Sequence, residues 1–290
     1  MIAYDGSVQS ESLVADLYSA GLPDIADVLL ITILEDLPPA EFSRFDVVER
    51  AKNAFRAPSL LGVVSHHRPD EDVLRESGAA AVTRMRRMFS EWNIEHRIIN
   101  GAPVETLLAE AIVWQPDLIL VGSHGRSLVG RFLLGSFSLE VASRALCSVR
   151  VSKIVSSNHK HKPRILMGSD SVDSVDHILK TVAGREWHDD TDVNILYTPQ
   201  PELVKAVEKL RTFDPEIVTR PVAFDLGSEL VNESKNWRSD AIFIADPHQN
   251  SPLISTVLGQ TACPVEIVRN TRPKNAENLM KGELYTECPQ

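Results

Sequence analysis

Three glycines and a serine have the spacing of a loop that could hold phosphate groups. Gly122, Gly125 and Gly135–Ser136 form the pattern G-x2-G-x9-G-S within VGSHGRSLVGRFLLGSFS. The pattern begins where a buried strand is expected to end and finishes where an amphipathic helix is expected to begin. Glycine lets the backbone turn sharply and approach a phosphate closely. The free N–H groups and positive dipole end of a helix N-terminus attract anions, so the segment predicts a phosphate site.

The side chains of this segment fit the same chemistry. Ser136 and Ser138 supply hydroxyl donors, and Arg126 and Arg131 supply positive charge in an otherwise acidic chain. No Gly-Lys-[Ser/Thr] follows, so the loop is not a Walker A motif. In the alternative interpretation the glycines only shape a turn and Ser136 only caps a helix. The third glycine and the strand–loop–helix context favour phosphate binding.

Asp5 is the second candidate, because it follows the first expected strand and precedes Gly6–Ser7. In an open doubly wound sheet, ligands bind beyond the carboxyl ends of the strands, where the strand order reverses. With the order 3-2-1-4-5, strands 1 and 4 flank that crevice and Asp5 faces the loop that begins at Gly122. A carboxylate there could accept hydrogen bonds from ribose hydroxyls or a base amine. Its alternative role is to cap the helix that follows.

Short runs rich in branched apolar residues alternate with longer amphipathic stretches, which is the pattern of parallel strands covered by helices. Runs such as DVLLITIL and DLILVG are nearly all apolar, as expected for strands buried on both faces. We expect strands at Ile2–Tyr4, Val28–Leu34, Glu95–Ile99, Asp117–Val121 and Val149–Lys153, and again at Arg164–Gly168, Asp192–Tyr197, Glu216–Val222, Asp240–Ala245 and Val265–Val268. The fold class is therefore α/β, with two tandem doubly wound five-stranded parallel sheets, and the strand order that we expect for each is 3-2-1-4-5.

Helices are expected between these strands, near Ser10–Ala20, Val104–Trp114, Ser136–Ala145, Val172–Gly184, Pro201–Leu210, Gly227–Trp237 and Leu253–Thr261. A long insertion at Pro39–Asn93 should hold more than one helix. Its Arg84, Arg86 and Arg87 could form a surface site, but a solvated helix face is favoured.

Three motifs of the first half recur in the same order in the second. Trp114-Gln-Pro-Asp117 before LILV matches Trp237-Arg-Ser-Asp240 before AIFI, Cys147-Ser-Val-Arg-Val matches Cys263-Pro-Val-Glu-Ile, and Ile2-Ala-Tyr-Asp5-Gly-Ser7 is echoed by Ile165-Leu-Met-Gly-Ser-Asp170-Ser171. Such internal similarity indicates duplication. It predicts one domain at residues 1–154, a linker at 155–163, a second domain at 164–269 and a polar, mobile tail at 270–290.

Composition excludes several classes of function. The 290 residues carry a formal net charge of −10, which argues against a nucleic-acid partner because such partners bind basic patches. Cys147, Cys263 and Cys288 are widely spaced, which predicts reduced thiols and no zinc site, with the first two buried as small hydrophobes. No apolar run reaches membrane-spanning length and no export signal is evident. We therefore expect a cytoplasmic protein with no membrane partner.

These residues resemble the universal stress proteins, specifically the branch that binds ATP. The resemblance covers both halves through DGS after the first strand, Gly101-Ala-Pro103 and the full glycine loop. It implies a Rossmann-like fold of the adenine nucleotide alpha hydrolase-like group, pairing of domains through their last strands, and a Mg²⁺ or Mn²⁺ ion held mainly by the phosphates. It also implies nucleotide contacts from Ala3, Asp5, Ile33, Val121, Gly122, Gly125, Gly135, Ser136 and Ser138.

The second half departs from this pattern. Aligned on Trp237 and Cys263, it has Ala245 and His248 in place of the first two glycines, and its loop is too short to wrap a triphosphate. His248 beside Asp246 could suggest a metal or catalytic site, but a loop turn is favoured. Asp170 persists and is expected to cap a helix. We therefore expect one nucleotide per chain, with the second half as an internal dimerisation partner.

Three functions remain open at the level of the sequence. The leading one is a cytosolic ATP-binding regulatory module in the stress response, with an unidentified protein partner and a possible homodimer. No motif places a catalytic carboxylate, His–Ser pair or lysine at the loop, so turnover, if any, should be slow. The alternatives are an adenylyl-transferring enzyme of the same fold group, which the missing SGGxDS-type loop argues against, and a nucleotide-free stress scaffold, which the intact first loop argues against.

Overall fold

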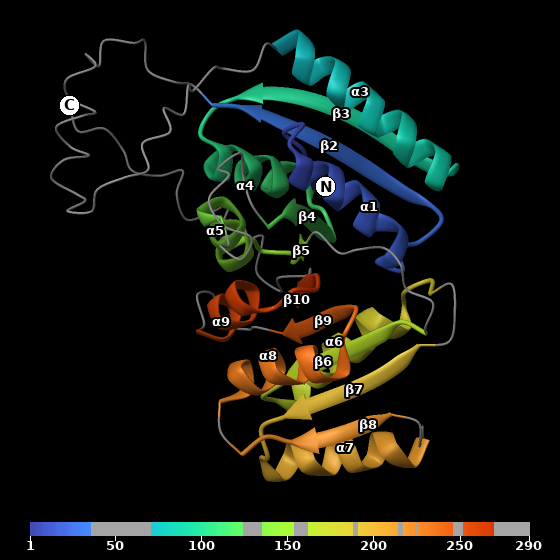
Figure 1. The fold of residues 1–290 in the computed structure, drawn as a ribbon, viewed down its shortest axis with the longest axis vertical. Helices are drawn as coiled ribbons and strands as arrows, with labels where there is room; N and C mark the ends of the chain where they lie inside the picture. The colour runs from blue at the N-terminus through green and yellow to red at the C-terminus, as the bar shows by residue number, and fades with distance from the viewer. Residues whose placement is uncertain are drawn as a thin grey trace, which may run out of the picture.

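The computed structural model describes residues 1–35, 71–123, 135–153, 162–187, 191–213, 217–223, 225–245 and 252–269. Within these ranges the chain forms one ten-stranded sheet with helices on both faces. The strand order is β3-β2-β1-β4-β5-β10-β9-β6-β7-β8. The first half of the chain builds the upper part of the molecule in Figure 1 and the second half builds the lower part.

The elements of the first half are β1 (Ile2–Ala3), α1 (Val8–Asp16), a 3-10 turn η1 (Leu17–Ser19), β2 (Ala26–Leu34), α3 (Glu71–Met88), β3 (Trp92–Asn100), α4 (Pro103–Trp114), β4 (Leu118–Gly122), α5 (Ser136–Arg144) and β5 (Ser148–Ser152). Those of the second half are β6 (Arg164–Ser169), α6 (Val172–Ala183), β7 (Asp192–Tyr197), α7 (Pro201–Phe213), β8 (Val218–Pro221), α8 (Leu226–Trp237), β9 (Ala241–Ala245), α9 (Pro252–Gln260) and β10 (Val265–Val268).

Each half has the expected strand order 3-2-1-4-5, with all pairs inside a half parallel. The two five-stranded sets join where β5 and β10 pair antiparallel, with Arg150 opposite Glu266 and an aliphatic pair on each side. The reversal follows from the pseudo-twofold relation between the halves. The two sheets are therefore continuous, and the last strand of each half is an inner strand.

The helices begin and end at residues that are suited to capping them. Ser7 and Asp225 cap α1 and α8 by accepting an N–H from the residue three positions later. The helix α6 is capped in the same way by Ser171, so the expectation that Asp170 caps it is wrong by one residue. The repeat is also visible at the C-termini of helices. Both α4 and α8 end at a C-cap residue with a left-handed backbone conformation, namely Gln115 with φ of 51° and Arg238 with φ of 55°.

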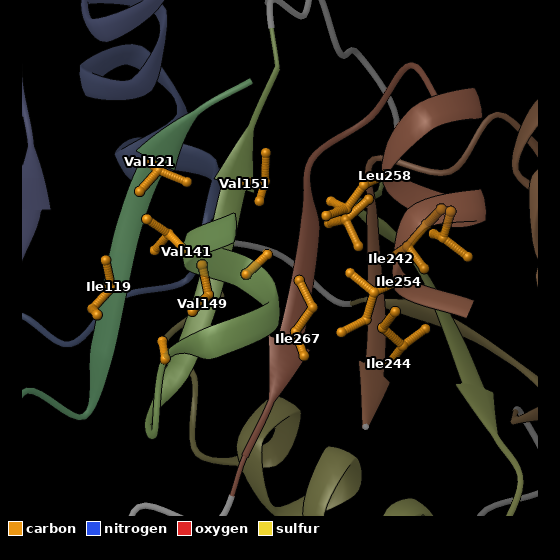
Figure 2. Packing of buried hydrophobic residues seen from close by; sticks show 14 of the residues in the cluster. Ile119, Val121, Val141, Val149, Val151, Ile242, Ile244, Ile254, Leu258 and Ile267 are labelled. Carbon is orange, nitrogen blue, oxygen red and sulfur yellow. The ribbon is translucent and has the colours of Figure 1, made fainter. Parts of the chain in front are cut away.

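The hydrophobic core is continuous on one face of the sheet and divided on the other. On the first face, α4, α5, α8 and α9 cover a single cluster that includes strands of both halves. Figure 2 shows Val149 and Val151 of β5 beside Ile267 of β10 in this cluster, with Ile254 and Leu258 of α9 close by. On the second face, α1 and α3 cover one cluster in the first half, and α6 and α7 cover another in the second.

The buried cysteines belong to this core, as the sequence predicted. Cys147 and Cys263 lie at the start of the last strand of each half and are free thiols. Burial raises the pKa of Cys147 to about 11 and that of Cys263 to about 12, so neither is a thiolate near neutral pH. Both act as small apolar side chains.

Several expectations fall outside the described residues. They concern Gly125, Arg126 and Arg131 in the glycine loop, Asp246 and His248 in the second half, the linker from 155 to 161, the tail from 270 to 290, and residues 39–70 of the insertion. The domain boundaries stay predictions. No helix among the described residues has the length and apolar character to cross a membrane.

Candidate functional site

The carboxyl ends of β1, β2 and β4 lie side by side at one end of the parallel strands. Ala3 pairs with Ile31 and Ile2 pairs with Leu120, so β1 stands between the other two strands. Both neighbours run parallel to it, which makes the gap between β1 and β4 the point where the strand order reverses. The topology therefore places the crevice where the sequence predicted it.

Some side chains at these strand ends are buried, and others are partly exposed to solvent. Ala3 and Ile33 are partly exposed and pack against the core cluster that contains Ile31 and Val121. Val121 of β4 is fully buried in that cluster. Ala3 and Ile33 thus offer partly exposed apolar atoms at these strand ends, which suit a flat apolar ring better than a charged group.

The turn after β1 is built around Asp5. One carboxylate oxygen of Asp5 accepts the backbone N–H of Ser7 at 3.0 Å, and Ser7, not Asp5, caps α1. Gly6 has a φ of +73°, a conformation that favours glycine, and a Cβ there would lie 3.1 Å from the hydroxyl of Ser77. The alternative role of Asp5 as the helix cap is thus taken by another residue.

The N-terminus of α5 is held against the end of β4. The backbone N–H of Gly135 donates to the carbonyl of Ser123 at 2.9 Å, and the buried hydroxyl of Ser138 donates to the carbonyl of Gly122 at 2.5 Å. Gly135 occupies the cap position, and no side chain of the described residues caps the helix. The first turn of α5 therefore lies close to the carboxyl end of β4, with the exposed Ser136 as its first residue.

Seven of the nine expected contact residues thus lie at or just beyond the carboxyl ends of the central strands of the first half. They are Ala3, Asp5, Ile33, Val121, Gly122, Gly135 and Ser136. Ser138 lies directly beneath them, with its hydroxyl engaged by Gly122. Gly125 lies outside the described residues. Among the described residues, no group of three or more His, Cys, Asp or Glu side chains could hold a metal ion.

A polar network behind β1 was not expected from the sequence. The hydroxyl of Tyr4 donates to Glu11 at 2.5 Å and lies 2.8 Å from the hydroxyl of Ser77, while Arg84 bonds the same Glu11 carboxylate. Burial, and then the hydrogen bond to Glu11, raise the pKa of Tyr4. The network joins α1 and α3 to Tyr4, which lies between the end of β1 and Asp5. One arginine of the insertion therefore forms a half-exposed ion pair.

The corresponding position in the second half is covered by a helix that packs against it. Gly168 pairs with Leu196 and Ile244, and the register makes it the counterpart of Ala3. The sequence match of Ile2 with Ile165 is therefore two residues out of register. Gly168 is buried, and a Cβ there would lie 2.5 Å from a methyl group of Leu230 in α8. Helix α8 thus rests directly on the strand where the first half has a partly exposed alanine.

A separate hollow of about 910 Å³ lies at the opposite end of the strands. Its lining includes Ala26, Trp92, Leu118 and Ser148, at the amino ends of four strands. Ligands of open parallel sheets bind at the carboxyl ends, so we assign the candidate site to the crevice and not to this hollow.

Comparison with known proteins identifies the family of the first half. The family model described as the universal stress protein family matches residues 1–153, which is more than half of the chain. The chain belongs to the universal stress protein family. A universal stress protein A homologue of Coxiella burnetii is 41% identical over 90 residues, and a universal stress protein of Methanocaldococcus jannaschii is 31% identical over 84 residues.

These matches cover 30% and 28% of the chain, and only 59% and 49% of the two relatives' own lengths. The likeness in fold extends further. The crystal structure of a universal stress protein from Archaeoglobus fulgidus matches 93% of this chain and 97% of its own, with a TM-score of 0.62 and 15% identity. That likeness supports the two-half fold of this universal stress protein but says nothing of its ligand.

The sequence missed one further cluster, which lies between the halves. Asp16, Arg150, Glu266 and Arg185 meet on the second face of the sheet, where the two separate cores leave a gap. A signal for it existed in the repeat, because the matched segments CSVRV and CPVEI carry opposite charges at the same position in otherwise apolar strands.

Proposed function

We propose that the first half of this universal stress protein binds ATP across the carboxyl ends of β1, β2 and β4. The adenine and ribose would lie by Ala3, Ile33 and Asp5. The triphosphate would lie along the segment from Gly122 to Gly135, including Gly125, and reach the N-terminus of α5. Val121 and Ser138 would support the site from beneath.

The observation that carries the proposal is the placement of α5. Its uncapped first turn is fixed to the end of β4 by Ser138 and by the backbone of Gly135. Free N–H groups and a positive helix end at the reversal point of a doubly wound sheet favour a phosphate-bearing ligand. The partly exposed Ala3 and Ile33 on the neighbouring strands suit the base of a nucleotide.

We further propose that Mg²⁺ or Mn²⁺ accompanies the nucleotide and is held mainly by phosphate oxygens, which are the hard ligands that such ions prefer. When bound, the ion would neutralise part of the triphosphate charge. The chain's own contribution is to orient the phosphates through backbone N–H groups and Ser136.

The second half would bind no ATP and act as the structural partner of the first. Its counterpart of Ala3 is the buried Gly168 under Leu230, and its counterpart of Gly122 is the buried Ala245. The protein would then work in the cytoplasm as a regulatory module of the stress response. Nucleotide occupancy would change the surface that the first half offers to a partner protein.

The proposal is tested by calorimetric titration of the full chain with Mg-ATP. We expect submillimolar affinity and a stoichiometry of one nucleotide per chain. In the double variant Gly122→Val, Gly135→Val, side chains occupy the backbone approach to the phosphates, and binding should weaken by at least about tenfold, equivalent to about 1.4 kcal/mol.

The matched control is Gly259→Val in α9, because a Cβ at Gly259 meets nothing within 4 Å. This variant should bind ATP like the wild type. Unchanged binding in the double variant would reject the proposed site. A wild-type chain that is purified without nucleotide and shows no thermal shift with ATP would instead support the nucleotide-free scaffold.

A further inference from the structure

The junction between the halves contains a buried chain of alternating charges. Arg150 of β5 makes two bonds of 2.8 Å to the carboxylate of Asp16 and reaches Glu266 of β10 at 3.5 Å. Glu266 is also paired with Arg185, which follows α6. The side chains of Arg150, Asp16 and Glu266 are only 1%, 3% and 0% exposed.

Arg150 and Glu266 occupy the same position in the repeat. Each stands three residues after a matched cysteine, Cys147 or Cys263, and the two are direct partners across the antiparallel pair. The pseudo-twofold axis therefore passes between them. In the same register, a pair of two β5 strands would place Arg150 opposite a second Arg150, and a pair of two β10 strands would place Glu266 opposite a second Glu266.

The contacts that flank this pair on β5 and β10 do not distinguish like from unlike halves. The flanking pairs are Val151 with Val265 and Val149 with Ile267, which are aliphatic on both sides. Two basic residues also have matching roles: Lys153 donates to the carbonyl of Leu258 in α9, and Arg269 donates to that of Ala142 in α5. Each half thus binds the last helix of the other half in a similar way.

We propose that Arg150 and Glu266 make the last-strand edge selective for an unlike half. The first half then pairs with the second half, and the pairing of two first halves or two second halves through this edge is disfavoured. The physical reason is the cost of like charges in a fully buried position. In the native pairing Arg150 and Glu266 attract each other at 3.5 Å, whereas a like pairing would place two charges of the same sign directly opposite each other at that position.

Two full-length variants with different affinity tags test this selectivity. Arg150→Glu leaves one positive and three negative groups in the cluster, and Glu266→Arg leaves three positive and one negative. Each variant alone should melt at a lower temperature than the wild type or accumulate in insoluble form. When the two are co-expressed, the unmodified Arg150 of one chain can meet the unmodified Glu266 of the other.

We therefore expect sequential purification on both tags to recover a soluble complex of two chains, with a higher melting temperature than either variant alone. Two differently tagged wild-type chains should give no such complex. The matched control is Arg144→Glu, the same change at a half-exposed arginine of α5, which should keep the wild-type melting temperature.

Three results would overturn the proposal. They are variants that melt like the wild type, a co-expressed pair that gives no soluble two-tag complex, and wild-type chains that exchange as readily as the variant pair. The readout needs no nucleotide, so it is independent of the proposed ATP site.

Discussion

Asp16 is the residue that makes a fully buried arginine tolerable in β5. Burial alone would raise the pKa of Asp16, but the charge of Arg150, its two hydrogen bonds and the hydroxyl of Ser152 bring that pKa below its usual value. The charge and hydrogen bonds of Asp16, and then those of Glu266, raise the pKa of Arg150 despite its burial. The pair is therefore ionised on both sides at neutral pH.

Asp16→Asn should be strongly destabilising at neutral pH, because among the described residues it leaves Arg150 with only Glu266, at 3.5 Å, as a charged partner. Breaking a buried ion pair costs about 3–5 kcal/mol, measurable as a loss in the free energy of unfolding in urea. The exposed i,i+4 pair of Asp176 with Lys180 provides the control, since Asp176→Asn should cost less than about 1 kcal/mol.

The difference between wild type and Asp16→Asn should depend on pH. Because the folded pKa of Asp16 is lowered, its stabilisation is fully present above the unfolded pKa of about 3.9 and is lost as the pH falls through the lower folded value. The two proteins should therefore approach each other in stability below about pH 4. A difference that stays constant down to pH 2 would contradict the ionised pair.

The sequence predicted the crevice residues better than this charge cluster, for a physical reason. Asp5 and Gly122 each mark the end of an apolar run, which is a local signal. Arg150 owes its burial to β10, which lies more than a hundred residues away, and to the end of α1. A charged residue in a short strand is usually exposed, so local pattern alone gives no warning of a buried pair.

At the scale of elements, the positions of strands follow from composition and their ends follow from pairing. The expected β7 and β10 agree with the structure to the residue. The strand expected at Glu95–Ile99 is longer in the structure, because β3 pairs with β2 from Trp92 to Asn100. The helix expected at Ser10–Ala20 ends early as α1 and closes in a 3-10 turn, where Asp16 turns toward Arg150.

The first turn of helix α5 contains two serines, Ser136 and Ser138, whose roles should be distinguishable by mutation. Ser136 is exposed at the first position of the helix and makes no cap bond, whereas Ser138 is buried and fixes the helix to Gly122. If ATP binds at this end, Ser136→Ala should weaken ATP binding and leave the unfolding free energy unchanged. Ser138→Ala should lower that free energy by about 1–3 kcal/mol, because a buried hydrogen bond is lost.

Calorimetric ATP titration and urea unfolding of both variants check this division, and each variant serves as the control of the other. Ser138→Ala should also weaken ATP binding, through the looser position of α5. Equal losses of stability in the two variants would show that the exposed serine is structural. The assignment of Ser136 to the phosphates would then fail.

At the scale of the whole molecule, the continuous core on one face should make the halves unfold together. The cluster under α4, α5, α8 and α9 has no boundary at the β5–β10 junction, and α5 contacts α9 across it (Figure 2). Two halves joined only by a linker and a small polar interface would instead move and unfold separately. The cooperative unit is therefore expected to be the entire described fold.

Leu258→Ala tests this, because Leu258 is a buried residue of α9 in the second half. Its truncation should cost about 2–5 kcal/mol. Hydrogen exchange under mild denaturant should report the same loss at β2 in the first half as at β7 in the second, since both open in one transition. Val113→Ala in α4 is the control, as that side chain is 80% exposed and should change neither. Protection lost at β7 but kept at β2 would mean that each half is stable by itself, and that the shared core joins two independent units.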